Sequence, residues 1–265
     1  MQWDVKELKN DNYLDRYTYR SIESIRKFLP GSKIILSTWQ SDHIDEDLDI
    51  DELILNKDPE RVEMISDDGE IKFVTVNNQI ITSYAGLDKV NTKYSLIIRS
   101  DMVLIGNGFL KYFLKYNKSK CEGFFKKKIV VLPTYSPRRI NKFLFDVCDW
   151  TYFGLTEDLK NMFSIPLMDK DKLKGEKVNG YNLISKNLGA EQYVWVNFLK
   201  KYSDVELPTS IYFSKELNKH SEESYAKNTI MISASRLGVK CLKMPYAGYG
   251  AIPCLFVTTV NDVDA

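Results

Sequence analysis

The segment Arg99-Ser100-Asp101 carries the most specific chemical signal in the sequence. It follows the apolar run at residues 94–98, which predicts a buried strand with one carboxylate at its tip. Ligands of open α/β sheets bind beyond the carboxyl ends of the strands. A carboxylate there can hold Mg²⁺ or Mn²⁺ together with ligand phosphates, and the metal would assist a departing diphosphate. The alternative is an aspartate that caps the next turn.

Two other polar segments have side chains suited to a charged or hydroxyl-rich ligand. Asn77, Asn78 and Gln79 place three amides together, which suits a polyhydroxy ligand, although Asn77 could instead cap the following helix. Arg138 and Arg139 place two guanidinium groups in one loop, and such forks match phosphate. A surface charge pair is the alternative for the two arginines.

Two charged stretches of opposite sign are less specific. Seven carboxylates lie between Asp42 and Glu52, but the glycine that an EF-hand loop needs is absent, so we expect a solvated loop. The main basic patch consists of Lys111, Lys115, Lys118, Lys120, Lys126, Lys127 and Lys128. Such a patch is either a solvated face or a contact for anionic lipid head groups.

Composition excludes several classes of protein. The 265 residues are 44% hydrophobic, which suits one large domain, and 37 basic against 36 acidic side chains argue against a nucleic-acid partner. His43 and His220 are too few for a multi-histidine zinc site. No signal peptide or membrane-spanning run is visible, and the four cysteines are widely spaced, so a cytoplasmic protein with free thiols is expected. Fingerprints of dinucleotide, P-loop and serine-hydrolase sites are missing.

Helix and strand signals alternate through the first 132 residues and would position these side chains. Helices are expected at residues 13–29, 76–90 and 109–116, and strands at residues 33–39, 94–98 and 126–132. This order predicts an α/β fold with a mainly parallel sheet flanked by helices, followed by a less regular C-terminal half. The first of these strands ends in Ser37, Thr38 and Trp39, where a ligand would bind.

Five motifs, taken in order and spacing, resemble the WavE-type lipopolysaccharide synthesis family. They lie at residues 21–39, 77–83, 86–101, 149–155 and 190–195. The resemblance extends over residues 20–245. It implies a bacterial glycosyltransferase of the GT-A (Rossmann-like) type with hexosyltransferase-like activity, and a single domain. Residues 1–132 would bind the nucleotide-sugar, and residues 133–265 would form the acceptor side.

The same resemblance implies the substrates and the cofactor. Such enzymes move a sugar from a nucleotide-sugar donor to a hydroxyl of a glycan or lipid-linked glycan, in lipopolysaccharide or capsule synthesis. They usually use a divalent metal, Mn²⁺ or Mg²⁺. Their place would be cytoplasmic, at the periphery of the inner membrane, with contact through the basic patch between Lys111 and Lys128.

The resemblance also assigns roles to individual residues. Asp101 matches the metal carboxylate of a strand-end acidic motif in which Arg99 replaces the first acid. Glu191 matches the position of the catalytic base of inverting enzymes, and Asp149 is the competing candidate. The donor would be bound by Ser37, Thr38, Trp39, Asn77, Asn78, Gln79, Arg99, Ser100, Arg138 and Arg139.

The beginning of the chain departs from the family pattern. Related sequences open with an apolar strand that ends in a Gln-Gly-Pro motif, and Gln2 is the expected remnant of that glutamine. The first strand is therefore expected to be truncated or missing, which would weaken the donor site. Two other functions stay open at this point: a catalytically degenerate glycan-binding protein and a nucleotidyltransferase.

Overall fold

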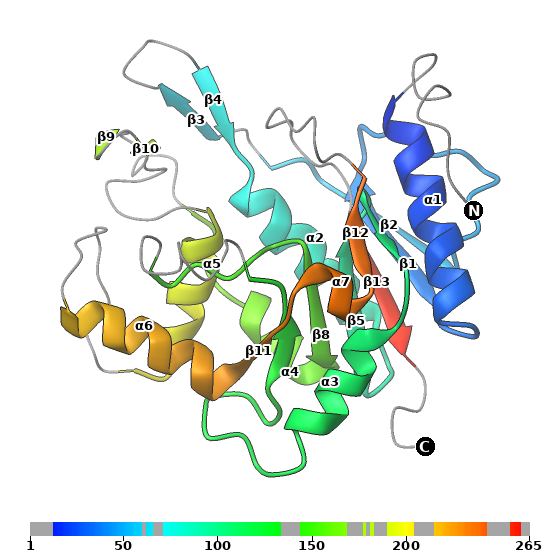
Figure 1. Cartoon of the computed structure of the whole chain (residues 1–265). Coiled ribbons are helices and arrows are strands. Elements are labelled where there is room, and N and C mark those ends of the chain that lie inside the picture. Colours follow the sequence, from blue (N-terminus) through cyan, green and yellow to red (C-terminus); the bar gives the residue numbers. More distant parts are fainter. Residues whose placement is uncertain are drawn as a thin grey trace.

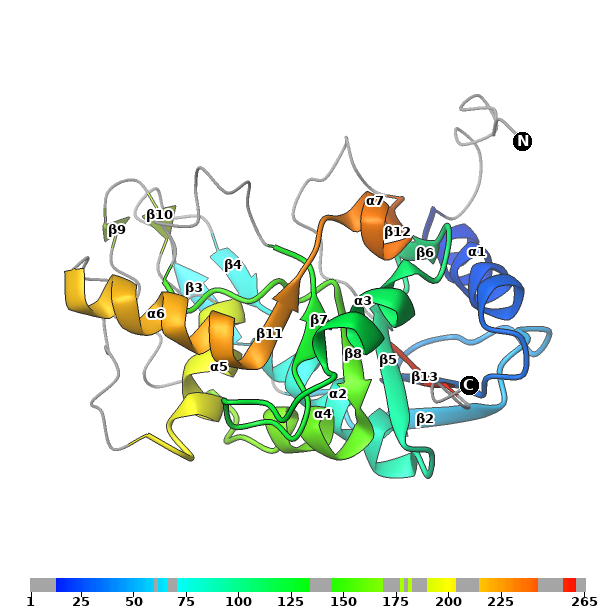
Figure 2. The same cartoon turned by 60° about the horizontal axis from the view of Figure 1, so that its bottom comes forward.

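The apolar strands assemble into one seven-stranded sheet with helices on both faces (Figure 1). The computed structural model describes residues 13–59, 62–65, 71–133, 144–168, 177–178, 181–182, 190–203, 215–242 and 255–260. The strands of this sheet are β1 (Ile34–Trp39), β2 (Glu52–Asn56), β5 (Tyr94–Arg99), β7 (Ile129–Val131), β8 (Thr151–Leu155), β11 (Thr229–Met231) and β13 (Leu255–Val260). Their order across the sheet is β11-β7-β8-β5-β13-β1-β2. Figure 2 shows β11, β7, β8, β5, β13 and β2 following one another across the molecule.

The sheet is mixed, which corrects the prediction of a mainly parallel one. In the described sheet, β11–β7 and β1–β2 are parallel neighbours and the other four neighbouring pairs are antiparallel. Continuous apolar runs indicate that a strand is covered on both faces. Central antiparallel strands between two helix layers have the same environment, so the runs do not encode strand direction. Here β8 and β13 run opposite to the other five strands.

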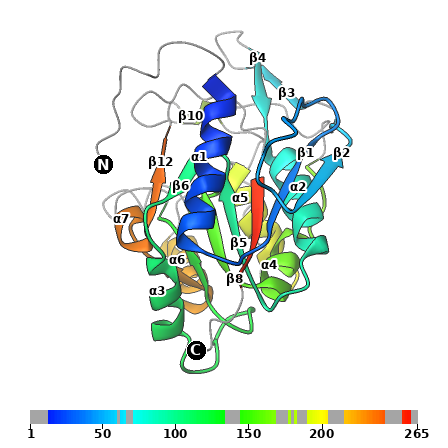
Figure 3. The same ribbon diagram turned by 90° about the vertical axis from the view of Figure 1, so that its right-hand side faces the viewer.

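Alternate side chains of β5 divide the core into two layers. Ile97 packs in a cluster with side chains of α2, α4 and α5, whereas Leu96 and Ile98 pack in a second cluster with α1, α3 and α7. Figure 3 shows α1 and α3 on one side of the sheet and α2 and α4 on the other. The helices are α1 (Tyr13–Phe28), α2 (Val76–Lys89), α3 (Gly108–Tyr116), α4 (Thr156–Phe163), α5 (Ala190–Leu199), α6 (Lys215–Asn228) and α7 (Ala234–Leu237).

The elements predicted for the first 132 residues are confirmed. The helix signals correspond to α1, α2 and α3, and the strand signals correspond to β1, β5 and β7. The C-terminal half is more regular than expected, because it supplies β8, β11 and β13 as well as α4 to α7. The sheet therefore takes strands from both halves of the chain, and β13 pairs with β1 and β5 at its centre.

A two-stranded ribbon supports the chain where it leaves β5. β6 (Met102–Leu104) pairs antiparallel with β12 (Val239–Cys241). Gly238 precedes β12 with a φ of 82°, and a Cβ at this position would lie 2.6 Å from the carbonyl carbon of Gly106. Only glycine fits such a backbone conformation and such a close approach without strain. The other ribbons pair β3 (Val62–Ile65) with β4 (Ile71–Val74) and β9 (Lys177–Val178) with β10 (Tyr181–Asn182).

The acidic stretch at residues 42–52 is bound to α1, so the prediction of a solvated loop holds only in part. Arg26 forms ion pairs with Asp49 at 2.9 Å and with Asp51 at 3.0 Å. Asp51 also accepts a hydrogen bond from the backbone of Ile34, at 2.7 Å. These acids therefore fix the connection between β1 and β2, where they have partners other than a metal ion.

Candidate functional site

One guanidinium group holds two carboxylates at the end of β5. Arg99 donates from Nε and Nη2 to the two oxygens of Asp101, at 3.1 and 3.0 Å. It donates from Nη1 to both oxygens of Asp149, at 3.2 Å each. The side chains of Arg99, Asp101 and Asp149 are 13%, 3% and 25% exposed. At the end of β5, Arg99 therefore binds two carboxylates in one largely buried ion-pair network.

Strand pairing explains why Asp149 lies beside the end of β5. In the antiparallel register of β5 and β8, Ile98 faces Thr151, so the residues just before β8 pass the tip of β5. The backbone amide of Arg99 donates to the Trp150 carbonyl at 3.3 Å. The Arg99 guanidinium also lies 6.0 Å from the centre of the Trp150 ring, within the range of a cation–π contact.

Asp101, which forms an ion pair with Arg99, is also held by its backbone. Its carbonyl accepts a hydrogen bond from the amide of Leu242, at 2.8 Å, directly after β12. The ribbon of β6 and β12 thus fixes the turn that carries the carboxylate. Because both the backbone and the side chain of Asp101 are engaged, this residue is part of the buried framework of the site.

Glu191 contributes a third carboxyl group from the first turn of α5. Burial and the negative charge of Asp149 raise the pKa of Glu191 to about 6, and the charge of Arg99 opposes this effect. The side-chain amide of the next residue, Gln192, donates to the Leu144 carbonyl at 2.5 Å. This bond ties the start of α5 to the segment that leads into Asp149.

Asp149 is likewise a largely buried carboxyl that lies beside Arg99. Burial raises the pKa of Asp149, the positive charge of Arg99 acts against that rise, and the negative charge of Asp101 adds to it. The negative charge of Asp149 raises the pKa of Glu191, and a carboxyl perturbed in this way is suited to general acid and base catalysis. Asp149 and Glu191, the two predicted catalytic residues, are thus brought into one site.

Two buried residues, one aromatic and one thiol, lie beneath the same region, and sequence reasoning did not assign either to the site. Tyr152 of β8 hydrogen-bonds with Gln79 of α2, and burial raises the pKa of its hydroxyl. Burial also raises the pKa of Cys148, so this thiol stays protonated and is a poor nucleophile. The signal that could have found Tyr152 was its place in the aspartate-tryptophan segment, three residues after Asp149.

Most of the residues predicted to bind the donor have internal partners. Ser37, Thr38 and Trp39 are buried at the end of β1. Asn56 donates to the Ser37 hydroxyl and to the Thr38 carbonyl, at 2.9 Å each, and the Thr38 hydroxyl donates to Asp42. These bonds join the ends of β1 and β2, and a role in donor binding stays a prediction.

The three amides at the start of α2 differ in their partners and exposure. Asn77 is buried and bonds in both directions with the backbone of Met168, donating at 3.0 Å and accepting at 2.7 Å. It therefore neither caps α2, whose N-cap residue is Thr75, nor faces solvent. Asn78 is partly exposed, and Gln79 reaches the site through Tyr152.

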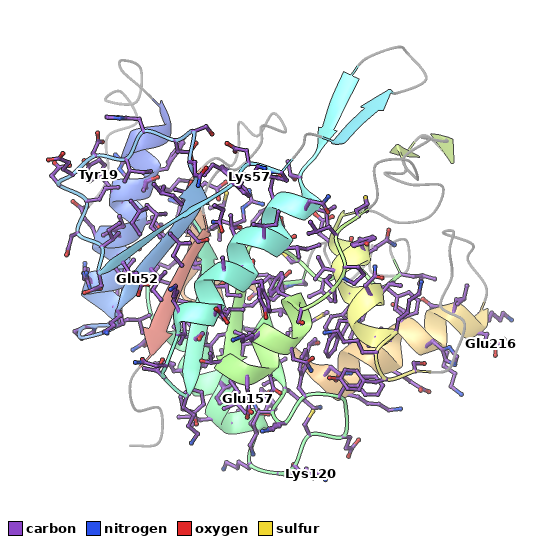
Figure 4. The ribbon with its side chains drawn as sticks, turned by 180° about the vertical axis from the view of Figure 1, so that it is seen from behind. Tyr19, Glu52, Lys57, Lys120, Glu157 and Glu216 are labelled. Carbon is purple, nitrogen blue, oxygen red and sulfur yellow. The ribbon has the colours of Figure 1, made fainter. Side chains whose placement is uncertain are left out.

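Of the two arginine and lysine regions predicted to bind a ligand, one falls outside the described residues and the other lies away from this site. Arg138 and Arg139 fall outside the described residues. The basic patch lies at the opposite edge of the sheet, because residues 117–128 lead into β7, which runs in the same direction as β5. Figure 4 shows Lys120 at one end of the molecule and Lys57, which follows the end of β2, at the other. The patch therefore does not face Arg99 and the three carboxyl groups of Asp101, Asp149 and Glu191, which we call the carboxyl cluster.

The residues expected to hold a metal do not fit that task as they are arranged. Both oxygens of Asp101 accept hydrogen bonds from Arg99, and the side chain is 3% exposed, so an ion would have to displace the guanidinium. Within the part of the chain that the structure describes, no three His, Cys, Asp or Glu side chains converge as a metal site. Metal dependence stays a prediction from the sequence.

Comparisons with known proteins agree with the resemblance found in the motifs. The family model described as WavE lipopolysaccharide synthesis matches residues 2–248. Comparisons with curated proteins and with solved structures each found no match. Among the described helices, none combines the length and the apolar character needed to cross a bilayer. Since the family model covers most of the 265 residues, the chain belongs to the WavE lipopolysaccharide synthesis family.

Proposed function

We propose that this protein is a glycosyltransferase that moves a sugar from a nucleotide-sugar to a hydroxyl of a bacterial surface polysaccharide, in lipopolysaccharide or capsule synthesis. Membership of the family supports a part in lipopolysaccharide synthesis. The observation that carries the proposal is the carboxyl pair of Asp149 and Glu191 at the strand ends, beside Arg99. The acceptor would be a glycan or a lipid-linked glycan.

Glu191 is the better candidate for the general base. Arg99 contacts Asp149 directly, at 3.2 Å, which favours the charged form of that carboxyl, whereas it acts on Glu191 through its charge. A base needs a pKa close to the working pH, and the pKa of Glu191, raised to about 6, meets that requirement. Asp149 then serves as the negative neighbour that raises the basicity of Glu191.

The proposed reaction inverts the configuration of the transferred sugar. The Glu191 carboxylate takes the proton of the acceptor hydroxyl while its oxygen attacks the anomeric carbon. The bond from that carbon to the donor phosphate breaks, and the nucleoside diphosphate leaves with the electron pair. The group near the reacting atoms would be Trp150, whose partly exposed aromatic ring is of the kind that stacks on sugar faces.

A donor screen tests this function. The purified chain is incubated with individual nucleotide-sugars and acceptor glycans, and release of the nucleoside diphosphate is measured along with thermal stabilisation. Acceptor-dependent release from one nucleotide-sugar is the expected result. Stabilisation by nucleoside triphosphates instead would favour a nucleotidyltransferase. Binding of glycan without turnover of any donor would favour a catalytically degenerate glycan-binding protein.

A further inference from the structure

The carboxylate of Asp101 points inward, toward a partner of its own chain. Its two oxygens are 3.1 and 3.0 Å from Nε and Nη2 of Arg99, which is the side-on, two-bond geometry typical of strong arginine–carboxylate pairs. With 3% of the side chain exposed, a ligand beyond the strand ends would meet other groups first.

The remaining edge of the same guanidinium reaches a different element. Nη1 of Arg99 contacts both oxygens of Asp149, which lies in the segment before β8. Arg99 therefore bridges the turn after β5 and the lead into β8. A planar guanidinium with its donors in a fixed fork transmits the position of one carboxylate to the other.

We propose that Asp101 and Arg99 are positioning residues that fix the Asp149 carboxylate near Glu191, and that Asp101 is not a metal ligand. The inference rests on the proposed function only where it treats Glu191 as the base. The bridge itself can be tested without any donor. Asp101 anchors Arg99, Arg99 holds Asp149, and Asp149 sets the environment of Glu191.

The groups around Glu191 determine how its pKa responds when the position of Asp149 changes. They are Asp149 and Cys148 from the segment before β8, Tyr152 from β8 and Arg99 from β5. Asp101 is not among the charges that act on Glu191. A change at Asp101 therefore reaches Glu191 by way of Arg99 and Asp149, and Asp101→Asn also removes a negative charge that acts on Asp149. Arg99→Lys keeps the charge of the side chain and changes its geometry, so the pair of variants separates charge from position.

The first experiment follows the proton of Glu191. The side-chain carboxyl carbons of glutamate are labelled with ¹³C, and the NMR titration of Glu191 is recorded for the wild type, Asp101→Asn and Arg99→Lys. We expect the titration midpoint of Glu191 to move down toward that of an ordinary glutamate in both variants. Asp88→Asn, which breaks the exposed pair with Lys160, is the matched control and leaves the midpoint in place. An unchanged midpoint in Asp101→Asn overturns the proposal.

A second experiment separates positioning from metal binding. Manganese alone is titrated into the wild type and Asp101→Asn and followed by electron paramagnetic resonance, and thermal unfolding is measured for Arg99→Gln, Asp101→Asn and the double variant. A bridge predicts no manganese binding that depends on Asp101. It also predicts that both single variants lower Tm and that the double variant is no worse than Arg99→Gln. Manganese binding that Asp101→Asn abolishes, without loss of Tm, supports the metal ligand instead.

Kinetics extend the same distinction once a donor is known. Misplacing a catalytic group by about 1 Å can cost about 100-fold in rate, so Arg99→Lys and Asp101→Asn should lower kcat by that order with little change in KM for the donor. A loss confined to KM overturns the positioning role. If the titration and Tm results hold but no donor turns over, the proposed function fails and the bridge stands.

Discussion

Two groups of charged residues lie at opposite edges of the same sheet. One group is largely buried and internally paired, whereas the other is exposed to solvent. At the ends of β5 and β8, Arg99, Asp101 and Asp149 are largely buried and bind one another. At the other edge, Lys111, Lys115, Lys118 and Lys120 are exposed. The carboxyl cluster also has a carboxyl group of raised pKa, Glu191. Figure 4 shows how far Lys120 lies from the strand-end edge marked by Lys57.

The difference teaches that charge density in a sequence is a poor guide to where chemistry occurs. The basic patch has more charged residues than the carboxyl cluster, but water screens exposed charges. Buried charges interact more strongly with their neighbours, and their protonation follows the structure around them. We therefore expect large effects from the carboxyl cluster and small ones from the basic patch.

The largest effect should follow from Glu191→Gln. Removal of a general base costs about 10²–10⁴-fold in rate, so kcat should fall by that factor while the fold is retained. Circular dichroism and initial rates with the donor identified by screening measure the two outcomes. Glu157→Gln on α4 is the matched control, since Glu157 is exposed and lies at the other edge of the sheet. Equal activity of both variants would remove Glu191 from the mechanism.

Next comes the stability of the buried network. Arg99→Ala leaves two buried carboxylates without their cation, which costs about 3–5 kcal/mol in comparable sites. Lys126→Ala breaks the exposed ion pair with Glu157 and should cost much less, because water screens the two charges. Urea denaturation gives the free energy of unfolding of both variants. The contrast between the two edges would be lost if the two values agreed.

The pH dependence of stability should show a smaller effect. The pKa of Glu191 is raised to about 6 in the folded protein, above the value of about 4.3 for an unfolded chain. Between these values the folded state binds a proton that the unfolded state has released, so the contribution of Glu191 falls as pH rises and is constant above about pH 6. Denaturation of the wild type from pH 4 to 8 should show this loss, and Glu191→Gln should lack it. A parallel curve for the variant would contradict the assignment.

The smallest effect per residue is expected for the basic patch. If it contacts anionic lipid, each lysine contributes about 1 kcal/mol near the membrane surface. Gln replacements at Lys111, Lys115, Lys118 and Lys120 should then reduce sedimentation with phosphatidylglycerol vesicles stepwise, without changing turnover. Lys57→Gln at the opposite edge is the control. Binding that survives all four replacements would leave these lysines as a solvated face.

Much of the fold could be predicted before the structure was known, because it depends on local pattern. Apolar runs located β1 and β5, and the Pro30-Gly31 pair ended α1. The direction of β8 and the insertion of β13 between β1 and β5 could not be predicted, since they depend on pairing between distant segments. The members of the carboxyl cluster were named from motifs, but their mutual contacts were not.

The sequence by itself determined the composition of the site: one arginine and three carboxyls, in motifs at residues 99–101, 149 and 191. It also determined the family and the positions of α1, α2, α3, β1, β5 and β7. Only the tertiary structure decided that Asp101 faces Arg99 and that the basic patch lies at the far edge. The physical reason is that burial and pairing set the charge and reach of an ionisable group, and both arise when distant strands come together.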